Sequence, residues 1–371
     1  MFDFKQYDFK RMNYSLVVLV LILVSIGTYL IRLVEPADGK KQIMGLVLGF
    51  MAMCFVALVD YHFVCRFIWL IYLANLVLLV LVFIPGIAHP QFGTNRWINL
   101  VAFDLQPSEV CKIMMIVVLA QFFTDRKEKM DRISTVLISA VMIMIPIAMV
   151  MKQPDLSSSM VLVFTFAIMI YAAGLSYKLI VPILALGIPS AIALFWYIQQ
   201  PYQKILDNYQ RGRILAFKFP DQYPAEVWQQ KISIEYMGSG RLYGKLFSGQ
   251  SVELKSKSLP VSESDFIFSV VGEQLGFIGA CVVIGLLAIV IFKCLAVART
   301  ARDRTGMLIA TGISAMFMFQ VFANIGVATL MLPNTGLPLP FISYGLSSLV
   351  SYMIGIGFIL NVSLQRKNMR G

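Results

Sequence analysis

The stretch YSLVVLVLILVSIGTYLIRL, residues 14–33, decides the fold class of this chain. It is apolar over most of its length, contains no acidic residue and carries a single arginine near its end. An α-helix needs about 20 mainly apolar residues to cross the hydrocarbon core of a bilayer. The stretch therefore predicts a transmembrane helix that follows a polar, basic N-terminal segment.

The composition extends this prediction to the whole chain. Of its 371 residues, 58% are hydrophobic and only 14% are charged, whereas soluble domains carry about 25% charged residues. The first apolar stretch is too long for the core of a cleavable signal peptide. We therefore expect a polytopic membrane protein that forms one integral membrane domain over residues 1–371.

Ten apolar stretches are interpreted as spans, at about 14–33, 43–60, 64–84, 108–124, 133–151, 156–173, 178–198, 267–292, 307–331 and 341–362. Lys and Arg collect in the cytoplasmic segments of membrane proteins. With the N-terminus inside, sixteen basic residues fall in inner segments and five in short outer loops. The predicted fold is all-α, with ten transmembrane helices and both termini in the cytoplasm.

The largest segment outside the membrane is predicted at 199–264, as an extracellular loop between helices seven and eight. Ordered loops of this length are uncommon and tend to be functional. The loop contains nine basic and six acidic residues. Its amphipathic stretches, such as 225–237, could lie on the bilayer surface.

Several function classes receive no support from the sequence. The net charge of +11 fits cytoplasmic loops beside anionic headgroups, so membrane lipids and not nucleic acids are the expected contacts. The five cysteines form no CxxC pair, and the two histidines lie far apart, which argues against a zinc site. No Walker A, GxSxG or HExxH motif is present, which argues against cytoplasmic nucleotide chemistry and zinc hydrolysis.

Charged residues inside or at the edge of spans are functional candidates, because burying a charge in lipid is expensive. Glu109 and Lys112, in QPSEVCKIMM, are three residues apart and share one helix face. They form either a structural ion pair or an inward-facing polar site. Asp155, in KQPDLSSS, is either a helix N-cap or, together with Glu109, a ligand of a divalent ion such as Mg²⁺ or Mn²⁺.

Asp265, in LPVSESDFIFSVVGEQLGFIG (259–279), stands where a polar segment meets a long apolar run. Its side chain either caps the helix that follows or serves as a general base. A carboxylate partly shielded from water has a raised pKa, which suits proton abstraction near neutral pH. Glu273 lies two turns further into the run, and we interpret it as a buried polar contact between helices.

Two further motifs are candidates for phosphate binding. Arg96 and Trp97, in FGTNRWINL, are either an interfacial anchor or a phosphate-binding arginine beside an aromatic platform. GSGRLYGK (238–245) has the wrong glycine spacing for a dinucleotide fingerprint, although its backbone N–H groups could approach a phosphate.

Taken together, these motifs resemble the SEDS (shape, elongation, division and sporulation) proteins, which include RodA and FtsW. The resemblance runs in the family's order through NRWINL, QPSEVCK, KQPDL, GSGRLYGK, SDFIFSVVGEQLGFIG and GLPLPFISYG, over about residues 90–362. It implies ten transmembrane helices, a large outer loop and peptidoglycan glycosyltransferase activity in the bacterial cytoplasmic membrane. The chain departs from the family pattern at Arg241, Ser157 and Leu346, but at no proposed catalytic side chain.

The resemblance also implies roles and partners. Asp265 matches the family's essential aspartate; Glu109, Lys112 and Asp155 match its QPSE, Lys and QPDL positions; Arg96 and Trp97 match its RW pair. The implied substrates are lipid II and undecaprenyl-pyrophosphate-linked glycan, and the implied partner is a class B penicillin-binding protein. Candidates to hold the pyrophosphate are Arg96, Lys112, Arg241 and Lys245, with a divalent cation near Glu109 and Asp155.

Two alternatives stay open beside the polymerase. Charged residues in a helix bundle also fit a flippase or transporter of lipid-linked precursors, and a third class is a scaffold for a transpeptidase. Within the family, the short tails and the ISYG motif favour a RodA-like member over an FtsW-like one.

Overall fold

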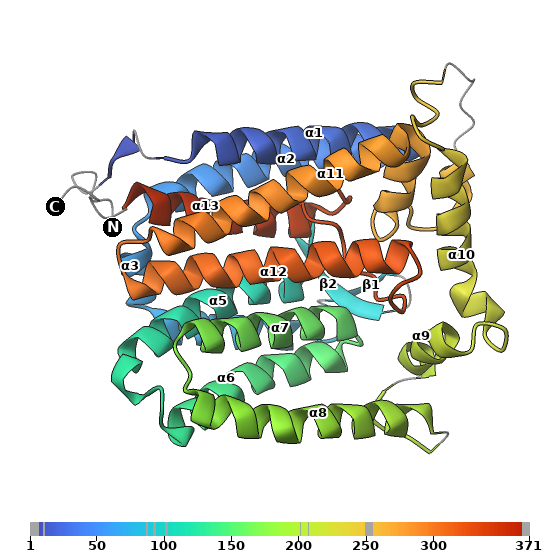
Figure 1. Ribbon diagram of the computed structural model, residues 1–371. Helices are drawn as coiled ribbons and strands as arrows, with labels where there is room; N and C mark the ends of the chain where they lie inside the picture. The colour runs from blue at the N-terminus through green and yellow to red at the C-terminus, as the bar shows by residue number, and fades with distance from the viewer. Residues whose placement is uncertain are drawn as a thin grey trace.

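The computed structural model describes residues 7–9, 12–86, 88–91, 94–100, 103–200, 202–206, 208–248 and 255–365. Its helices run side by side in a bundle (Figure 1). Eight helices among these residues are long and apolar enough to cross a membrane. They are α1 (Tyr14–Val34), α2 (Pro36–Leu58), α5 (Pro107–Asp125), α6 (Ile133–Lys152), α8 (Tyr177–Gln199), α11 (Ile267–Arg299), α12 (Arg304–Ala328) and α13 (Leu346–Leu364).

Two shorter apolar helices, α4 (Ile68–Leu81) and α7 (Leu156–Ala172), occupy the positions of two further predicted spans. A five-residue helix, α3 (Tyr61–Cys65), precedes α4. The prediction of a helical, polytopic membrane protein is confirmed. The total of ten spans stays a prediction, because α4 and α7 are shorter than the eight long helices.

The two ends of the described chain lie at the same end of the bundle. The backbone N–H of Asp8 donates to the carbonyl of Leu364 at 3.2 Å, and the Asn361 amide lies 3.4 Å from the Tyr7 hydroxyl. Helices α9 (Asn208–Lys218) and α10 (Pro224–Ser239), from the long segment between α8 and α11, lie at the opposite end (Figure 1). This arrangement agrees with the orientation predicted from the basic residues.

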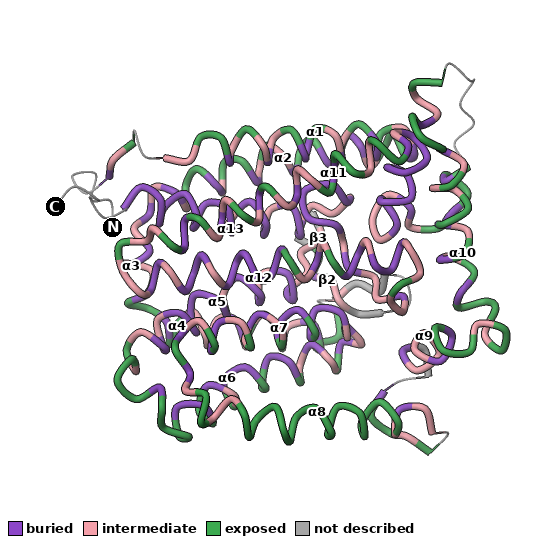
Figure 2. The backbone as a smooth tube through the Cα atoms, viewed as in Figure 1, coloured by how far each residue is buried: buried purple, intermediate pink, exposed green. Residues whose placement is uncertain are grey.

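Small residues bring α2 and α13 close together. A Cβ added to Gly49 would lie 2.9 Å from the Cγ of Met353, and one added to Gly357 would lie 2.8 Å from the carbonyl oxygen of Met53. Helices in membranes associate through such close backbone approaches. Figure 2 shows α5, α12 and α13 as the buried core, whereas α8 is exposed along most of its length.

The outer segment before α5 forms a small antiparallel sheet in the order β1-β2-β3: β1 (Ala88–Gln91), β2 (Thr94–Leu100) and β3 (Phe103–Leu105). The sequence predicted an outer loop here, and its strands were not predicted. Strands of four, seven and three residues are too short to show a clear alternation of apolar and polar residues. The sheet places Arg96 and Trp97 near the start of α5.

Helix α10 packs on the protein and closes the outer end of α12. The Gln230 amide donates to the carbonyls of Val327 and Leu332 at 2.8 and 2.9 Å. The Ser233 hydroxyl donates to the carbonyl of Ala328 at 2.9 Å. The last carbonyls of a helix have no partner within the helix, and the side chains of α10 supply partners at the end of α12. The buried face of the predicted 225–237 stretch therefore packs against α12 and not against lipid.

Helix α11 is broken at Gly276, whose φ of 68° and ψ of −171° are not helical. The freed backbone groups pair with the 241–246 segment: Phe277 N–H donates to the Arg241 carbonyl at 2.9 Å, and Leu246 N–H donates to the Gln274 carbonyl at 3.1 Å. Irregular backbone at membrane depth is tolerated only where protein or water satisfies it. The GSGRLYGK motif supplies these partners.

Candidate active site

Asp265 lies directly before α11, at the outer end of the bundle. Its backbone N–H donates to the Val261 carbonyl at 3.1 Å. Its own carbonyl accepts a 2.8 Å hydrogen bond from the side-chain amide of Asn324, which also donates to the Leu337 carbonyl at 2.7 Å. Asn324 is only 1% exposed, so one buried side chain on α12 fixes Asp265 against the segment that precedes α13.

A glycine in that segment leaves room beside the Asp265 carboxylate. Gly336 has a φ of +73°, and a Cβ added to it would lie 3.1 Å from Oδ2 of Asp265 and 3.7 Å from Nη1 of Arg213. The left-handed conformation favours glycine, and here a side chain would also intrude between charged groups. The carboxylate of Asp265 and the guanidinium of Arg213, from α9, therefore border the same small space.

Burial raises the pKa of Asp265 to about 6. The positive charges of Arg213 and Arg96 oppose this rise, and the negative charge of Glu263 adds to it. At pH 7 such a group is mostly ionised but is a stronger base than an ordinary aspartate. A pKa close to the working pH suits a general base.

Arg96 reaches this region from β2. Its Nε donates to the carbonyl of Gln153 at 2.9 Å, and its Nη2 donates to the carbonyl of Pro154. In the first turn of α7, the hydroxyl of Ser157 donates to the carbonyl of Thr335, the residue before Gly336. The predicted motifs around Arg96, Asp155 and Asp265 are thus connected by hydrogen bonds at one end of the bundle.

Asp155 is the N-cap of α7, as one of its two predicted roles required. Its Oδ1 accepts a 3.0 Å hydrogen bond from the Ser158 backbone N–H. Its Oδ2 accepts from the Ser108 hydroxyl at 3.0 Å and from the Gln106 amide at 3.3 Å. The side chain therefore joins the starts of α5 and α7.

Glu109 and Lys112 form a fully enclosed ion pair in the first turns of α5. The Lys112 Nζ lies 2.7 Å from Oε1 of Glu109, and the two side chains are 1% and 2% exposed. The ion pair, one of the two alternatives that their spacing left open, is therefore formed. The second oxygen, Oε2 of Glu109, is buried without a hydrogen-bond partner among the described residues.

The residues do not by themselves fit a divalent cation. Hard cations take six or more oxygen ligands, and the described part of the chain contains no group of three or more His, Cys, Asp or Glu that could hold a metal. Lys112 neutralises Glu109, and N–H and O–H donors occupy Asp155. The cation near Glu109 and Asp155 stays a prediction.

Arg241 and Lys245 lie elsewhere, beside the break in α11. Lys245 forms an ion pair with Glu273, whose carboxylate also accepts from the backbone N–H groups of Lys255 and Ser256 at 3.0 and 2.9 Å. Glu273 thus anchors the extracellular segment, which corrects the interpretation of Glu273 as a contact between helices. Arg241 is exposed.

Backbone N–H groups at the end of the same motif already have partners in this conformation. The backbone N–H groups of Gly244, Lys245 and Leu246 donate to the carbonyls of Gly240, Glu273 and Gln274, so none of the three is available to an anion. Arg241 replaces a glycine of the family pattern in the left-handed region, at a φ of 51°.

Sequence reasoning did not select three residues that the structure places at Asp265. Arg213 was one basic residue among nine in the long extracellular segment, and only its place on α9 distinguishes it. Asn324 is a polar residue inside an apolar span, and such residues are functional candidates for the same reason as buried charges. Gly336 occurs in an ordinary turn sequence, NTGLP.

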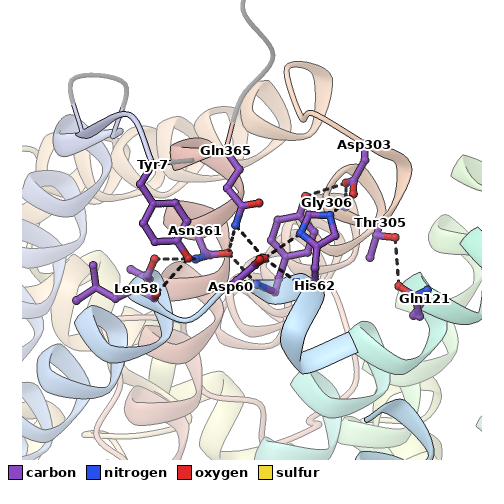
Figure 3. Close-up of polar contacts among 12 residues, drawn as sticks. Tyr7, Leu58, Asp60, His62, Gln121, Asp303, Thr305, Gly306, Asn361 and Gln365 are labelled. Atoms are coloured by element: carbon purple, nitrogen blue, oxygen red, sulfur yellow. Dashed lines mark hydrogen bonds and ion pairs between the residues drawn. The ribbon is translucent and has the colours of Figure 1, made fainter. Parts of the chain in front are cut away.

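A second polar cluster lies at the end of the bundle where Tyr7 and Gln365 lie (Figure 3). His62 lies between two carboxylates: its Nε2 is 2.6 Å from Asp303 and its Nδ1 is 2.8 Å from Asp60. Hydrogen bonds to Asp303 and Asp60 raise the pKa of His62 against the opposing effect of burial.

This cluster joins three separate parts of the chain. The Tyr61 hydroxyl donates to Asp303 at 2.8 Å, and the Asn361 side-chain oxygen accepts from the Tyr61 backbone N–H at 3.1 Å. It therefore ties α3 to the start of α12 and the end of α13. Because α9, which carries Arg213 to Asp265, lies at the opposite end (Figure 1), we interpret the cluster as a structural clamp and not as part of the active site.

Comparisons with known proteins bear on the whole chain. A family model for FtsW, RodA and SpoVE, described as "Cell cycle protein", matches residues 9–368. The probable peptidoglycan glycosyltransferase FtsW of Trichlorobacter lovleyi is 33% identical over 98% of this chain and 96% of its own length. The peptidoglycan glycosyltransferase MrdB of Escherichia coli is 31% identical over 81% of this chain and 79% of its own length.

Among solved structures, a chain from a study titled "Structural coordination of polymerization and crosslinking by a peptidoglycan synthase complex" has the same fold. Its TM-score is 0.80 at 26% identity, over 95% of this chain and 97% of that one.

Proposed function

The chain belongs to the FtsW/RodA/SpoVE family of cell cycle proteins, and we propose that it is a peptidoglycan glycosyltransferase in which Asp265 is the general base. It is a multi-pass protein of the bacterial cytoplasmic membrane. The single observation that carries the role of Asp265 is its environment. It is a carboxylate with a pKa raised to about 6 at the outer end of the bundle, beside two arginines.

The relatives give the class of reaction, and that environment gives Asp265 its role in it. The substrate is lipid II, and the Asp265 carboxylate takes the proton from the 4-hydroxyl of the acceptor sugar. The oxygen forms a bond to the anomeric carbon of the growing glycan's reducing-end sugar. The bond between that carbon and the lipid pyrophosphate breaks, and the pyrophosphate leaves with the electron pair.

Negative charge that develops on the leaving group needs nearby donors. Arg96 is the best placed of the predicted phosphate ligands, because its charge acts on Asp265. Trp97 is its neighbour on β2. Lys112 and Lys245 are each held in an ion pair with a glutamate, so either would have to leave that partner to bind phosphate directly. Together with Arg241, they are weaker candidates.

The proposed partner is a class B penicillin-binding protein, a transpeptidase that crosslinks the new strands. The similarity to a chain of a peptidoglycan synthase complex supports this. Relatives named FtsW and MrdB both match over most of the chain, so the assignment to a RodA-like member stays a prediction.

The main rival is a flippase for the same lipid-linked precursor. The experiment that separates the two uses the purified chain in liposomes with fluorescent lipid II, with and without its transpeptidase. We expect glycan ladders on a gel. Movement of lipid II between leaflets with no ladders, even with the transpeptidase present, would favour the flippase.

A further inference from the structure

Helix α9 brings a second guanidinium to Asp265 from the long extracellular segment. Arg213 lies in the middle of α9 (Asn208–Lys218). A Cβ added to Gly336 would lie 3.7 Å from Nη1 of Arg213 and 3.1 Å from Oδ2 of Asp265, so both groups border the same position. Of the charged groups that act on Asp265, Arg213 has the largest effect, ahead of Glu263 and Arg96. The reaction centre is therefore completed by a residue from outside the bundle.

The other arginine of α9 has a different task. Arg211 donates from Nε to the carbonyl of Ile198 at 3.2 Å and from Nη2 to the carbonyl of Gln199 at 3.0 Å. These bonds tie α9 to the end of α8. Residues two apart on a helix are about 200° apart around its axis, so Arg211 and Arg213 leave the helix on opposite sides.

Arg213 and Arg96 differ in how they are held. Two backbone carbonyls fix the guanidinium of Arg96 at the start of α7. Arg213 comes from a separate element and reaches the same carboxylate. Both guanidiniums act on Asp265, and the Glu263 carboxylate opposes their effect. Arginine binds phosphate oxygens through two parallel hydrogen bonds. A guanidinium that borders the same space as the Asp265 carboxylate suits an anionic ligand there.

We propose that Arg213 is an anion-binding residue of the reaction centre, which holds the diphosphate of the lipid-linked substrate next to Asp265. This inference rests on the proposed glycosyltransferase function and adds a residue from α9 to it. It assigns α9 a direct part in the reaction: Arg213 neutralises charge on the diphosphate that leaves the reducing end of the growing glycan.

The test compares purified Arg213→Gln, Arg213→Lys and Lys218→Gln with the unaltered chain in the lipid II polymerisation assay. Lys218 is an exposed residue of the same helix that contacts Gln199, so its replacement removes the same charge away from Asp265. We expect Arg213→Gln to lower kcat/KM by about 10²–10³-fold, the effect of removing one well-placed donor. Arg213→Lys should recover part of the loss, and Lys218→Gln should stay within a few-fold of the unaltered chain.

A pH profile separates a direct role from a structural one. The groups facing Asp265 are Arg213 from α9, Arg96 from β2 and Glu263 from its own loop. Because Arg213 lowers the pKa of Asp265, its loss should move the acid limb of the rate profile to higher pH. A folding defect would lower the rate at every pH without moving that limb.

Inhibition by inorganic pyrophosphate keeps the proposal testable if Arg213→Gln does not fold. Lysine keeps the charge but cannot form two parallel bonds, so Arg213→Lys should be inhibited several-fold less strongly. Unchanged inhibition in Arg213→Lys, or unchanged kcat/KM in a folded Arg213→Gln, would overturn the proposal. An unaltered chain that makes no glycan would instead contradict the proposed function itself.

Discussion

Asp265→Asn is expected to reduce polymerisation of lipid II by about 10²–10⁴-fold, the usual contribution of a general base. Asparagine has nearly the same shape but cannot accept the proton of the sugar hydroxyl. The hydrogen bond from Asn324 goes to the backbone carbonyl of residue 265, so the substitution leaves it in place. The variant should therefore unfold at the same temperature as the unaltered chain while making almost no glycan.

The matched control is Glu263→Gln, which neutralises a carboxylate two residues away. The backbone carbonyl of Glu263 accepts from Tyr344 N–H at 2.8 Å, and this bond does not need the side chain. We expect this variant to retain most of its activity. Turnover within about tenfold of normal in Asp265→Asn would remove Asp265 from the role of base. Growth of cells that carry only Asp265→Asn would favour the scaffold hypothesis.

Lys112→Met is expected to lower the free energy of unfolding by about 3–5 kcal/mol, because it leaves the Glu109 carboxylate buried without its counterion. Both side chains are at most 2% exposed, and Oε2 of Glu109 already lacks a hydrogen-bond partner among the described residues. Thermal unfolding in detergent measures the loss. The double variant Glu109→Gln with Lys112→Met should recover most of it, since no unpaired charge remains.

The same variants separate the structural role from the others predicted at this position. If Lys112→Met unfolds normally but raises KM for lipid II, Lys112 binds the substrate. A chelator shows whether polymerisation by the unaltered chain requires Mg²⁺ or Mn²⁺. If it does, and the stable double variant no longer responds to the metal, Glu109 holds a metal ion. Lys112 pairs with Oε1 of Glu109, and Asp155 caps α7, so we expect the structural role to dominate.

Hydropathy predicted the bundle because it is a local property of the chain. The spans at 14–33 and 133–151 fall within a few residues of α1 and α6, and the N-cap at Asp155 could be read from the residues around it. The same locality explains why the sheet was not predicted, because its strands are too short to give a local pattern. It also explains the break in α11, which depends on partners about 30 residues away in the chain, as in the bond from Phe277 to Arg241.

The candidate site was predictable only in part, because its contacts join residues far apart in sequence. Asp265 could be selected from its place before an apolar run. Lys245 is paired with Glu273, which makes it a weaker candidate for a phosphate ligand, while the position of α9 brings Arg213 beside Asp265. Local sequence does not say which of several basic residues in an extracellular loop reaches a particular carboxylate.

The pH dependence of polymerisation by the unaltered chain tests the role of Asp265 most directly. With saturating lipid II, the rate should be level near neutral pH and should fall as the pH drops through the pKa of Asp265, which burial raises to about 6. The direction follows because a general base acts in its ionised form. The residual activity of Asp265→Asn should lack this acid limb. A rate that stays level down to about pH 5 in folded protein, well below the expected inflection, would contradict the assignment of Asp265 as the base.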